Sequence, residues 1–115
     1  MTPERLDISS FSKDKGPAIA IRQDHWGIVS SILEKHVPQY EVWAFGSRAK
    51  WTAKKYSDLD LAIITDKNLP PTLLADLNED FSESNLPFKV DILDWSATTE
   101  NFKQIIMDQK VIILG

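Results

Sequence analysis

The sequence predicts an α+β fold, a small mixed β-sheet with helices packed mainly on one face. Segments with apolar residues three and four positions apart alternate with short continuous apolar runs, as expected for helices that alternate with buried strands. The chain has 115 residues, of which 43% are hydrophobic, which is enough for one core but not for two. We therefore expect one domain over residues 18–115, preceded by a flexible polar arm over residues 1–17.

The N-terminal half contains a predicted helix, two strands and a polar segment between the strands. Apolar residues fall at helical spacing over residues 18–37, which predicts a helix with one buried face that Pro38 ends. The β-prone residues 41–45 precede a glycine and predict a short strand. Residues 47–55 are polar and basic and are interpreted as a brief helix, and the apolar run over residues 59–65 predicts a second strand.

The C-terminal half contains two predicted helices, a third strand and a terminal apolar run. Two prolines open a helix over residues 70–81, since proline is well tolerated in a first turn. Residues 88–95 predict the third strand, and Thr98 or Thr99 caps a helix that ends at about Asp108. The side chains that we expect this last helix to bury are Phe102, Ile105 and Ile106. The run over residues 111–114 is either a short strand or the last segment of the core.

Composition excludes several classes of protein. No apolar run is long enough to span a bilayer, and the N-terminus lacks the apolar stretch of a signal peptide. Seventeen acidic and 13 basic residues give a net charge of −4, which disfavours a general electrostatic grip on nucleic acid. The absence of cysteine excludes disulfides and thiolate metal sites and fits a cytoplasmic protein.

Three carboxylates point to chemistry on metal-bound phosphates. Asp58 and Asp60 project on the same side of the second strand, where they repel each other unless a cation lies between them. Asp91 joins them if the third strand pairs beside the second. Such oxygen ligands suit Mg²⁺, and three carboxylates can hold the two metal ions that phosphoryl or nucleotidyl transfer uses.

The segment after the first strand has the composition of a phosphate-binding turn. Gly46 lets the backbone turn tightly against a phosphate, and Ser47 offers a hydroxyl and an amide at the start of the brief predicted helix. Arg48 and Lys50 follow one turn later and add positive charge against a triphosphate.

These motifs resemble the polymerase-beta-type nucleotidyltransferase superfamily over about residues 20–114. The stretches over residues 45–50 and 56–64 are most similar to the minimal nucleotidyltransferases, or MNT proteins, which form toxin–antitoxin pairs with HEPN partners. The resemblance implies a polymerase-beta-like nucleotidyltransferase fold. It also makes Asp58, Asp60 and Asp91 the ligands of Mg²⁺, with two ions expected, and ATP the substrate.

The resemblance further implies a role for each motif residue. Asp91 would also activate the acceptor hydroxyl, while Gly46 and Ser47 would hold the β and γ phosphates with help from Arg48. The implied reaction transfers AMP from ATP to a tyrosine of a small all-helical HEPN-type partner. Trp51 stands where the family often has glycine. The bulk of its side chain would narrow the pocket for the base or the triphosphate, so the sequence leaves the nucleotide preference open.

Three functions compete at this stage. The first is a Mg²⁺-dependent enzyme that modifies a partner protein, and the second is a non-catalytic antitoxin or nucleotide-binding subunit that neutralises its partner by binding. The third is a subunit of a small-molecule nucleotidyltransferase, which normally needs a further helical domain. Since only one helix and a tail follow Asp91, we expect another chain to supply the acceptor surface.

An apolar patch is expected beside the carboxylates. If all the helices pack on the other side of the sheet, several apolar side chains on the carboxylate face stay uncovered and offer a docking surface. These side chains are Ala62, Ile64, Leu93 and Trp95. Alternatively, the N-terminal arm folds back over the patch through Leu6, Ile8 and Phe11.

Overall fold

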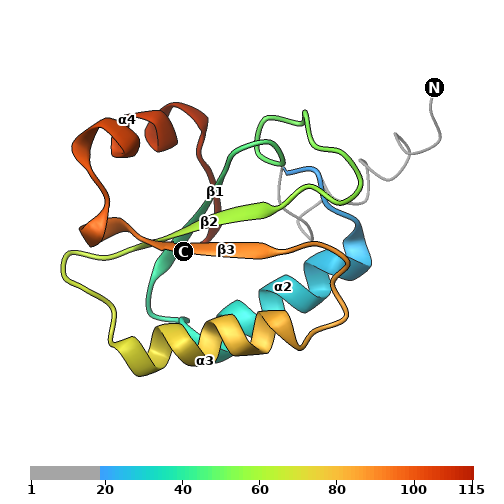
Figure 1. The fold of residues 1–115 in the computed structure, drawn as a ribbon, viewed down its shortest axis with the longest axis horizontal. Coiled ribbons are helices and arrows are strands. Elements are labelled where there is room, and N and C mark those ends of the chain that lie inside the picture. The colour runs from blue at the N-terminus through green and yellow to red at the C-terminus, as the bar shows by residue number, and fades with distance from the viewer. Residues whose placement is uncertain (1–18) are drawn as a thin grey trace.

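Four strands form one mixed sheet, in the order β3-β2-β1-β4, in the computed structural model, which describes residues 19–115 (Figure 1). The central strand β1 (Glu41–Phe45) runs antiparallel to both of its neighbours, β2 (Leu59–Ile64) and β4 (Val111–Leu114). On the outer side of β2, β3 (Val90–Asp94) runs parallel to it. The sheet is therefore mixed, as predicted, and the terminal apolar run is a strand.

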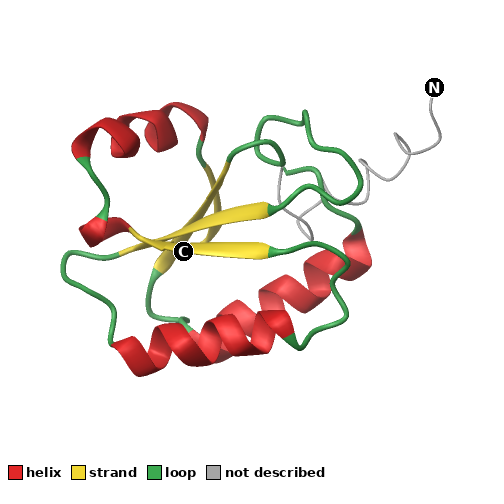
Figure 2. Ribbon diagram, in the orientation of Figure 1, coloured by secondary structure: helices red, strands yellow, loops and turns green. Residues whose placement is uncertain are grey.

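Helices cover both faces of this sheet (Figures 1 and 2). The long helices α2 (Gln23–His36) and α3 (Pro71–Ser82) lie together on one face, and α4 (Glu100–Gln109) lies on the other. A single 3-10 turn, η1 (Trp95–Ala97), connects β3 to the segment before α4. This arrangement confirms the α+β class. No helix within residues 19–115 is long and apolar enough to cross a membrane.

The main core lies between the sheet and the pair α2 and α3. Along β2, Leu59, Leu61 and Ile63 are fully buried on this side, since alternate residues of a strand share a face. Leu33 from α2 and Leu77 from α3 pack against them, also with no exposed surface. Because β2 is held by this core, the residues between its core positions are fixed on the opposite face, where α4 lies.

Two predicted boundaries near the N-terminus need correction. The first helix begins at Gln23 rather than at residue 18, because Ile19 and Ile21 are buried in the core before the helix starts. Residues 47–55 form turns rather than a brief helix. Within them, the N–H of Lys50 donates to the carbonyl of Gly46 at 3.1 Å, but no helical ladder continues. The arm expected over residues 1–17 lies outside the described residues.

The C-terminal elements follow the prediction more closely. The third strand ends at Asp94, because Trp95 already belongs to the 3-10 turn. Thr99 is the N-cap of α4, and its side-chain oxygen accepts a hydrogen bond from the N–H of Phe102 at 3.3 Å. This contact confirms the predicted capping threonine.

The carboxylate face is not open as expected, because α4 packs on it. Ile106 has no exposed surface and forms a second, smaller core with Trp43, Phe45 and Ala62. The expectation that Ala62 would be uncovered is therefore wrong, and the three further apolar residues of that face (Ile64, Leu93 and Trp95) pack against the same cluster. The predicted burial of Phe102 and Ile105 is also wrong, since they are 37% and 47% exposed. Ile106 lies on the helical face that meets the sheet, and Phe102, one turn earlier, contacts the Phe45 ring at a centroid distance of 5.8 Å while part of its surface stays exposed.

Candidate active site

Two of the predicted carboxylates lie side by side on parallel strands. Asp60 on β2 is in register with Asp91 on β3. On the other side of β2, it is in register with Phe45 on β1. The pairing of β2 with β3 was the condition for bringing Asp91 onto the face of Asp58 and Asp60, and the structure meets it. The carboxylates thus share the sheet face on which α4 packs.

The electrostatics of these carboxylates favour a positive partner. Burial raises the pKa of Asp60 to about 6, and the charges of Asp91 and Asp58 add to this effect. A carboxylate that gains a proton so easily lacks compensating positive charge in its surroundings. A cation placed among the three groups would relieve the repulsion that raises this pKa.

Asp58 and Asp91 are the more open members of the group. Asp58 is exposed just before β2, and its negative charge acts on the nearby guanidinium of Arg48. The Asp91 side chain is 45% exposed, and its Oδ1 lies 3.4 Å from the Nζ of Lys89. Both groups are therefore accessible to a ligand that approaches from solvent.

The Gly46 turn lies directly against Asp60. Gly46 has a φ of +79°, and a Cβ at this position would overlap the carboxylate of Asp60. Only glycine permits both the backbone conformation and the close approach. Within the described residues, the hydroxyl of the following Ser47 has no hydrogen-bond partner, so it is available to a ligand.

The structure gives Arg48 a different task from the one expected. Its side chain is 6% exposed and its guanidinium donates to three backbone carbonyls, those of Ala20, Ser57 and Lys55, at 2.7, 3.0 and 3.2 Å. It also lies 4.0 Å from the centroid of the Phe88 ring. With these contacts, the guanidinium joins the turns around the site rather than reaching toward a phosphate.

Gln109 is a site residue that the sequence did not reveal. Its side-chain Oε1, at the end of α4, accepts a hydrogen bond from the N–H of Gly46 at 2.8 Å. The two residues are 63 positions apart, and the sequence around Gln109 does not indicate that its side chain has a specific hydrogen-bond partner. Only the packing of α4 on the carboxylate face brings them together.

The donor set fits a divalent cation that shares its ligands with a nucleotide. In the part of the chain that the structure describes, no three carboxylate or imidazole groups converge closely enough to hold a metal ion by themselves. Mg²⁺, however, typically takes one or two carboxylates and fills its other positions with water and substrate phosphates. The pair Asp58 and Asp60, with Asp91 beside it, offers hard oxygen donors of this kind.

Asp94 and Trp51 are not members of the carboxylate group formed by Asp58, Asp60 and Asp91. Asp94 has a structural role, because its carboxylate accepts from the hydroxyl of Thr65 and from the N–H groups of Leu69 and Ser96 at 2.6, 2.8 and 3.0 Å. Trp51 has a φ of +62°, which lies in the region that glycine adopts most easily. Glycine, which the family often has here, adopts this backbone conformation without strain.

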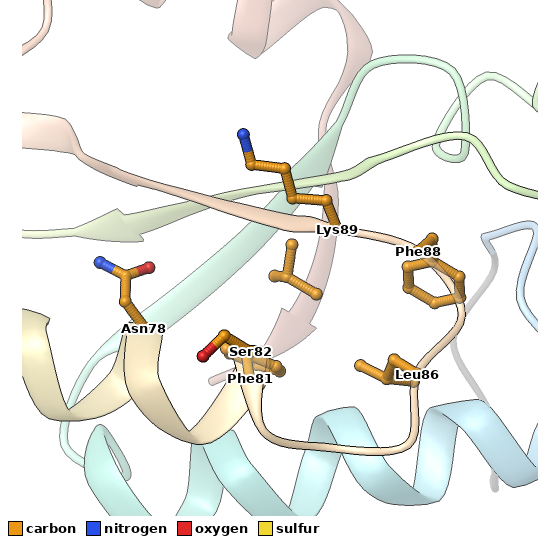
Figure 3. Close-up of a pocket in the computed structure, with 7 residues that line it drawn as sticks. Asn78, Phe81, Ser82, Leu86, Phe88 and Lys89 are labelled. Atoms are coloured by element: carbon orange, nitrogen blue, oxygen red, sulfur yellow. The ribbon is translucent and has the colours of Figure 1, made fainter.

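A separate cavity lies on the other face of the sheet (Figure 3). It has a volume of about 350 Å³ between the C-terminal half of α3 and the beginning of β3. Phe81, Phe88 and Val90 are three of its lining residues and belong to the main core. Because the sheet separates this cavity from the carboxylates, we assign it no part in the site.

The chain is similar to known proteins across most of its length. A family model described as "Polymerase beta, Nucleotidyltransferase" matches residues 29–115. The Probable protein adenylyltransferase MntA from Haemophilus influenzae is 53% identical over 93 residues, which cover 81% of this chain and 82% of that protein.

Solved structures show the same fold at lower sequence identity. A toxin–antitoxin structure with AMP-PNP matches with a TM-score of 0.65 and 22% identity, over 77% of this chain and 72% of that chain. A complex of tri-AMPylated HEPN toxin and MNT antitoxin from Shewanella oneidensis matches with a TM-score of 0.59 and 20% identity, over 77% and 68%. At these identities the likeness establishes the polymerase-beta-like fold alone.

Proposed function

Because this chain belongs to the polymerase beta nucleotidyltransferase family, we propose that it transfers AMP from ATP to a hydroxyl of a partner protein, as the antitoxin of a toxin–antitoxin pair. The observation that carries the proposal is the register of Asp60 with Asp91, beside a glycine turn that only a residue without a Cβ can form. The 53% identity to a relative named as a protein adenylyltransferase supports the choice of AMP and of a protein acceptor.

The carboxylates and the glycine turn divide the work of binding ATP. Asp58, Asp60 and Asp91 would hold Mg²⁺, with two ions expected, and the raised pKa of Asp60 fits a group that normally has a cation beside it. When bound, Mg²⁺ supplies positive charge to the triphosphate and to the leaving pyrophosphate. The hydroxyl of Ser47 and the turn at Gly46 would receive the β and γ phosphates, while Arg48 keeps the turn in place.

Asp91 is the proposed base of the reaction. Its half-exposed carboxylate would take the proton of the partner's hydroxyl as the hydroxyl oxygen attacks the α-phosphorus of ATP. A bond forms between that oxygen and the phosphorus, the bond from the α-phosphorus to the bridging oxygen breaks, and pyrophosphate leaves. The acceptor then carries AMP as a phosphodiester.

The acceptor would come from a second protein that covers the exposed carboxylates. We expect it to be a small all-helical HEPN-type protein, since a solved complex of a HEPN toxin with an MNT antitoxin contains a chain with this fold. A net charge of −4 supports a protein acceptor rather than general binding of nucleic acid. ATP, Mg²⁺ and a chain without cysteine all fit a reaction in the cytoplasm.

Label transfer tests the proposal. The chain is mixed with the protein encoded by its neighbouring gene, Mg²⁺ and ATP labelled either on the α or on the γ phosphate. We expect the label on the partner from α-labelled ATP alone, because AMP transfer retains only the α phosphate. The variant Asp58→Asn with Asp60→Asn should transfer none.

Each other outcome identifies a competing function. A stable complex without label on the partner would indicate an antitoxin that acts by binding. Label on a small molecule in the absence of the partner would indicate a small-molecule nucleotidyltransferase. Label from γ-labelled ATP would indicate phosphorylation and would contradict the proposal.

A further inference from the structure

We propose that Gln109 is a positioning residue of the nucleotide site, which sets the Gly46–Ser47 turn in the conformation that receives phosphates. The inference rests on the proposed function, since it assigns a role toward the same triphosphate. It stands on one contact, the 2.8 Å hydrogen bond from the N–H of Gly46 to the side-chain Oε1 of Gln109.

The Gly46 amide needs this acceptor because no strand partner serves it. β1 ends at Phe45, and Gly46 turns away from the ladder with its φ of +79°. A half-buried N–H without a partner costs free energy, so the turn would rearrange to find one. With Gln109 in place, the peptide before Gly46 has a fixed orientation, and the hydroxyl of Ser47 one residue later stays free for a ligand.

Gln109 is itself held in place from both sides along the chain. One turn earlier in α4, Ile106 is fully buried against Phe45 and Trp43. Two residues later, Val111 pairs with Ala44 on β1. Between them the Nζ of Lys110 lies 3.8 Å from the centroid of the Trp43 ring. Because its neighbours in the chain are held by these contacts, Gln109 can fix the conformation of the Gly46 turn.

The possible roles of Gln109 differ in their effects on melting temperature and on ATP binding. A residue that only stabilises the fold would change the melting temperature and the fraction of active protein, with no effect on affinity for ATP. A residue that orients the phosphate turn changes the KM for ATP more than kcat, because the phosphates then meet misplaced groups in the ground state. A third possibility is that Oε1 competes with a phosphate for the Gly46 amide, in which case its removal would lower KM.

The test compares two substitutions at Gln109 with a matched one elsewhere on α4. Gln109→Met keeps the length of the side chain and removes the acceptor. Gln109→Glu keeps an acceptor oxygen, so the turn stays paired, but adds a negative charge close to Asp60. The control is Gln104→Met, the same change on the same helix at an exposed glutamine that donates a hydrogen bond to Asp108 at 3.4 Å.

We expect Gln109→Met to raise both the KM and the calorimetric Kd for ATP about three- to tenfold, with kcat nearly unchanged, as for loss of one hydrogen bond. Gln109→Glu should lower the melting temperature slightly, because its charge adds to the repulsion around Asp60, and should raise the KM for ATP by an amount that shrinks with added salt. Gln104→Met should leave both constants unchanged.

The results separate failure of this inference from failure of the proposed function. An unchanged or lowered Kd for ATP in Gln109→Met, with the parent active, overturns the positioning role alone. A parent that binds ATP but transfers nothing overturns the proposed function, while the Kd values still decide the role of Gln109. A parent that binds no nucleotide overturns both.

Discussion

Asp60 and Asp91 are neighbours on two parallel strands, 31 positions apart in the chain, and the negative charge of Asp91 helps to raise the pKa of Asp60. Among the described residues, Lys89 forms an ion pair with Asp91: its Nζ lies 3.4 Å from Oδ1 of Asp91, and its side chain is 72% exposed. An exposed lysine screens such a pair weakly. The chain therefore keeps two like charges together at a cost in stability, which is typical of a binding site.

The first prediction concerns this cost. Asp60→Asn removes one of the repelling charges and keeps the shape of the side chain. We expect it to abolish AMP transfer and to raise the melting temperature of the metal-free protein by a few degrees, which corresponds to about 1 kcal/mol. Calorimetry without metal and label transfer with Mg²⁺ measure the two effects.

The control for this prediction is Asp66→Asn, an exposed aspartate in the loop after β2. It should change neither the melting temperature nor the transfer. If Asp60→Asn transferred AMP at the rate of the parent, Asp60 would not belong to the site. If it melted well below the parent, the carboxylate would stabilise the fold, and the argument from repulsion would be wrong.

The second prediction concerns the glycine turn. Gly46→Ala places a methyl group against the carboxylate of Asp60 and forces alanine into a left-handed conformation. We expect a loss of about 1–2 kcal/mol in the free energy of unfolding and a weaker affinity for ATP. Gly27→Ala is the matched control, because nothing lies within 4 Å of a Cβ there and alanine favours the helix α2.

Urea denaturation and ATP titration check this pair of variants. Gly27→Ala should unfold at a slightly higher urea concentration than the parent, and its affinity for ATP should be unchanged. Equal behaviour of the two variants would mean that the close approach of Gly46 to Asp60 has no consequence for stability or binding.

The placement of Asp60 beside Asp91 was predictable because strand periodicity and chain order fix it. Asp58 and Asp60 share a face by their spacing, and Asp91 lies among apolar residues of a recognisable strand. A local pattern is enough for such a prediction when each residue's direction follows from its own strand. Only the pairing of β2 with β3 had to be assumed.

The parts that escaped prediction depend on contacts between distant segments. The exposure of Ile105 depends on which face of α4 meets the sheet, and a short helix with several apolar residues does not specify that face. Phe102 shares the face of Ile106 and contacts Phe45, but it is still 37% exposed. The sequence predicted Arg48 as a phosphate ligand because its neighbours in the chain are basic and polar. Its actual partners include the carbonyl of Ala20, 28 positions away, which no local pattern reveals.

The third prediction tests this structural role of Arg48. Arg48→Lys keeps the charge but cannot reach all three carbonyls, and it loses the stacking on Phe88. We expect the free energy of unfolding to fall by about 2–4 kcal/mol. Arg22→Lys is the control, since the Arg22 side chain is 72% exposed and pairs with the exposed Asp24, so its loss should stay within about 0.5 kcal/mol.

Denaturation curves of the two arginine variants decide between a structural and a ligand-binding Arg48. If Arg48→Lys unfolded like the parent but bound ATP much more weakly, the guanidinium would serve the phosphates directly. The original expectation from the sequence would then be restored.

The last prediction is a pH dependence that arises from Asp94. Burial acts to raise the pKa of this carboxyl, but the hydrogen bonds from Thr65, Leu69 and Ser96 outweigh it and hold the pKa below its ordinary value of 3.8. A group whose pKa is lower in the folded state adds stability at pH values above its unfolded pKa, and this stability is lost as the pH falls through the folded pKa. Asp94→Asn should therefore lower the free energy of unfolding by about 1–2 kcal/mol at pH 7.

The difference between the parent and Asp94→Asn should shrink as the pH falls below 3.8, because a protonated aspartic acid resembles an asparagine in its hydrogen bonds. Asp76→Asn, at an exposed position on α3, is the control and should follow the parent at every pH. Urea denaturation from pH 7 down to about pH 3 measures all three proteins. A constant difference across this range would show that Asp94 stabilises the loop after β2 through its shape and not through its charge.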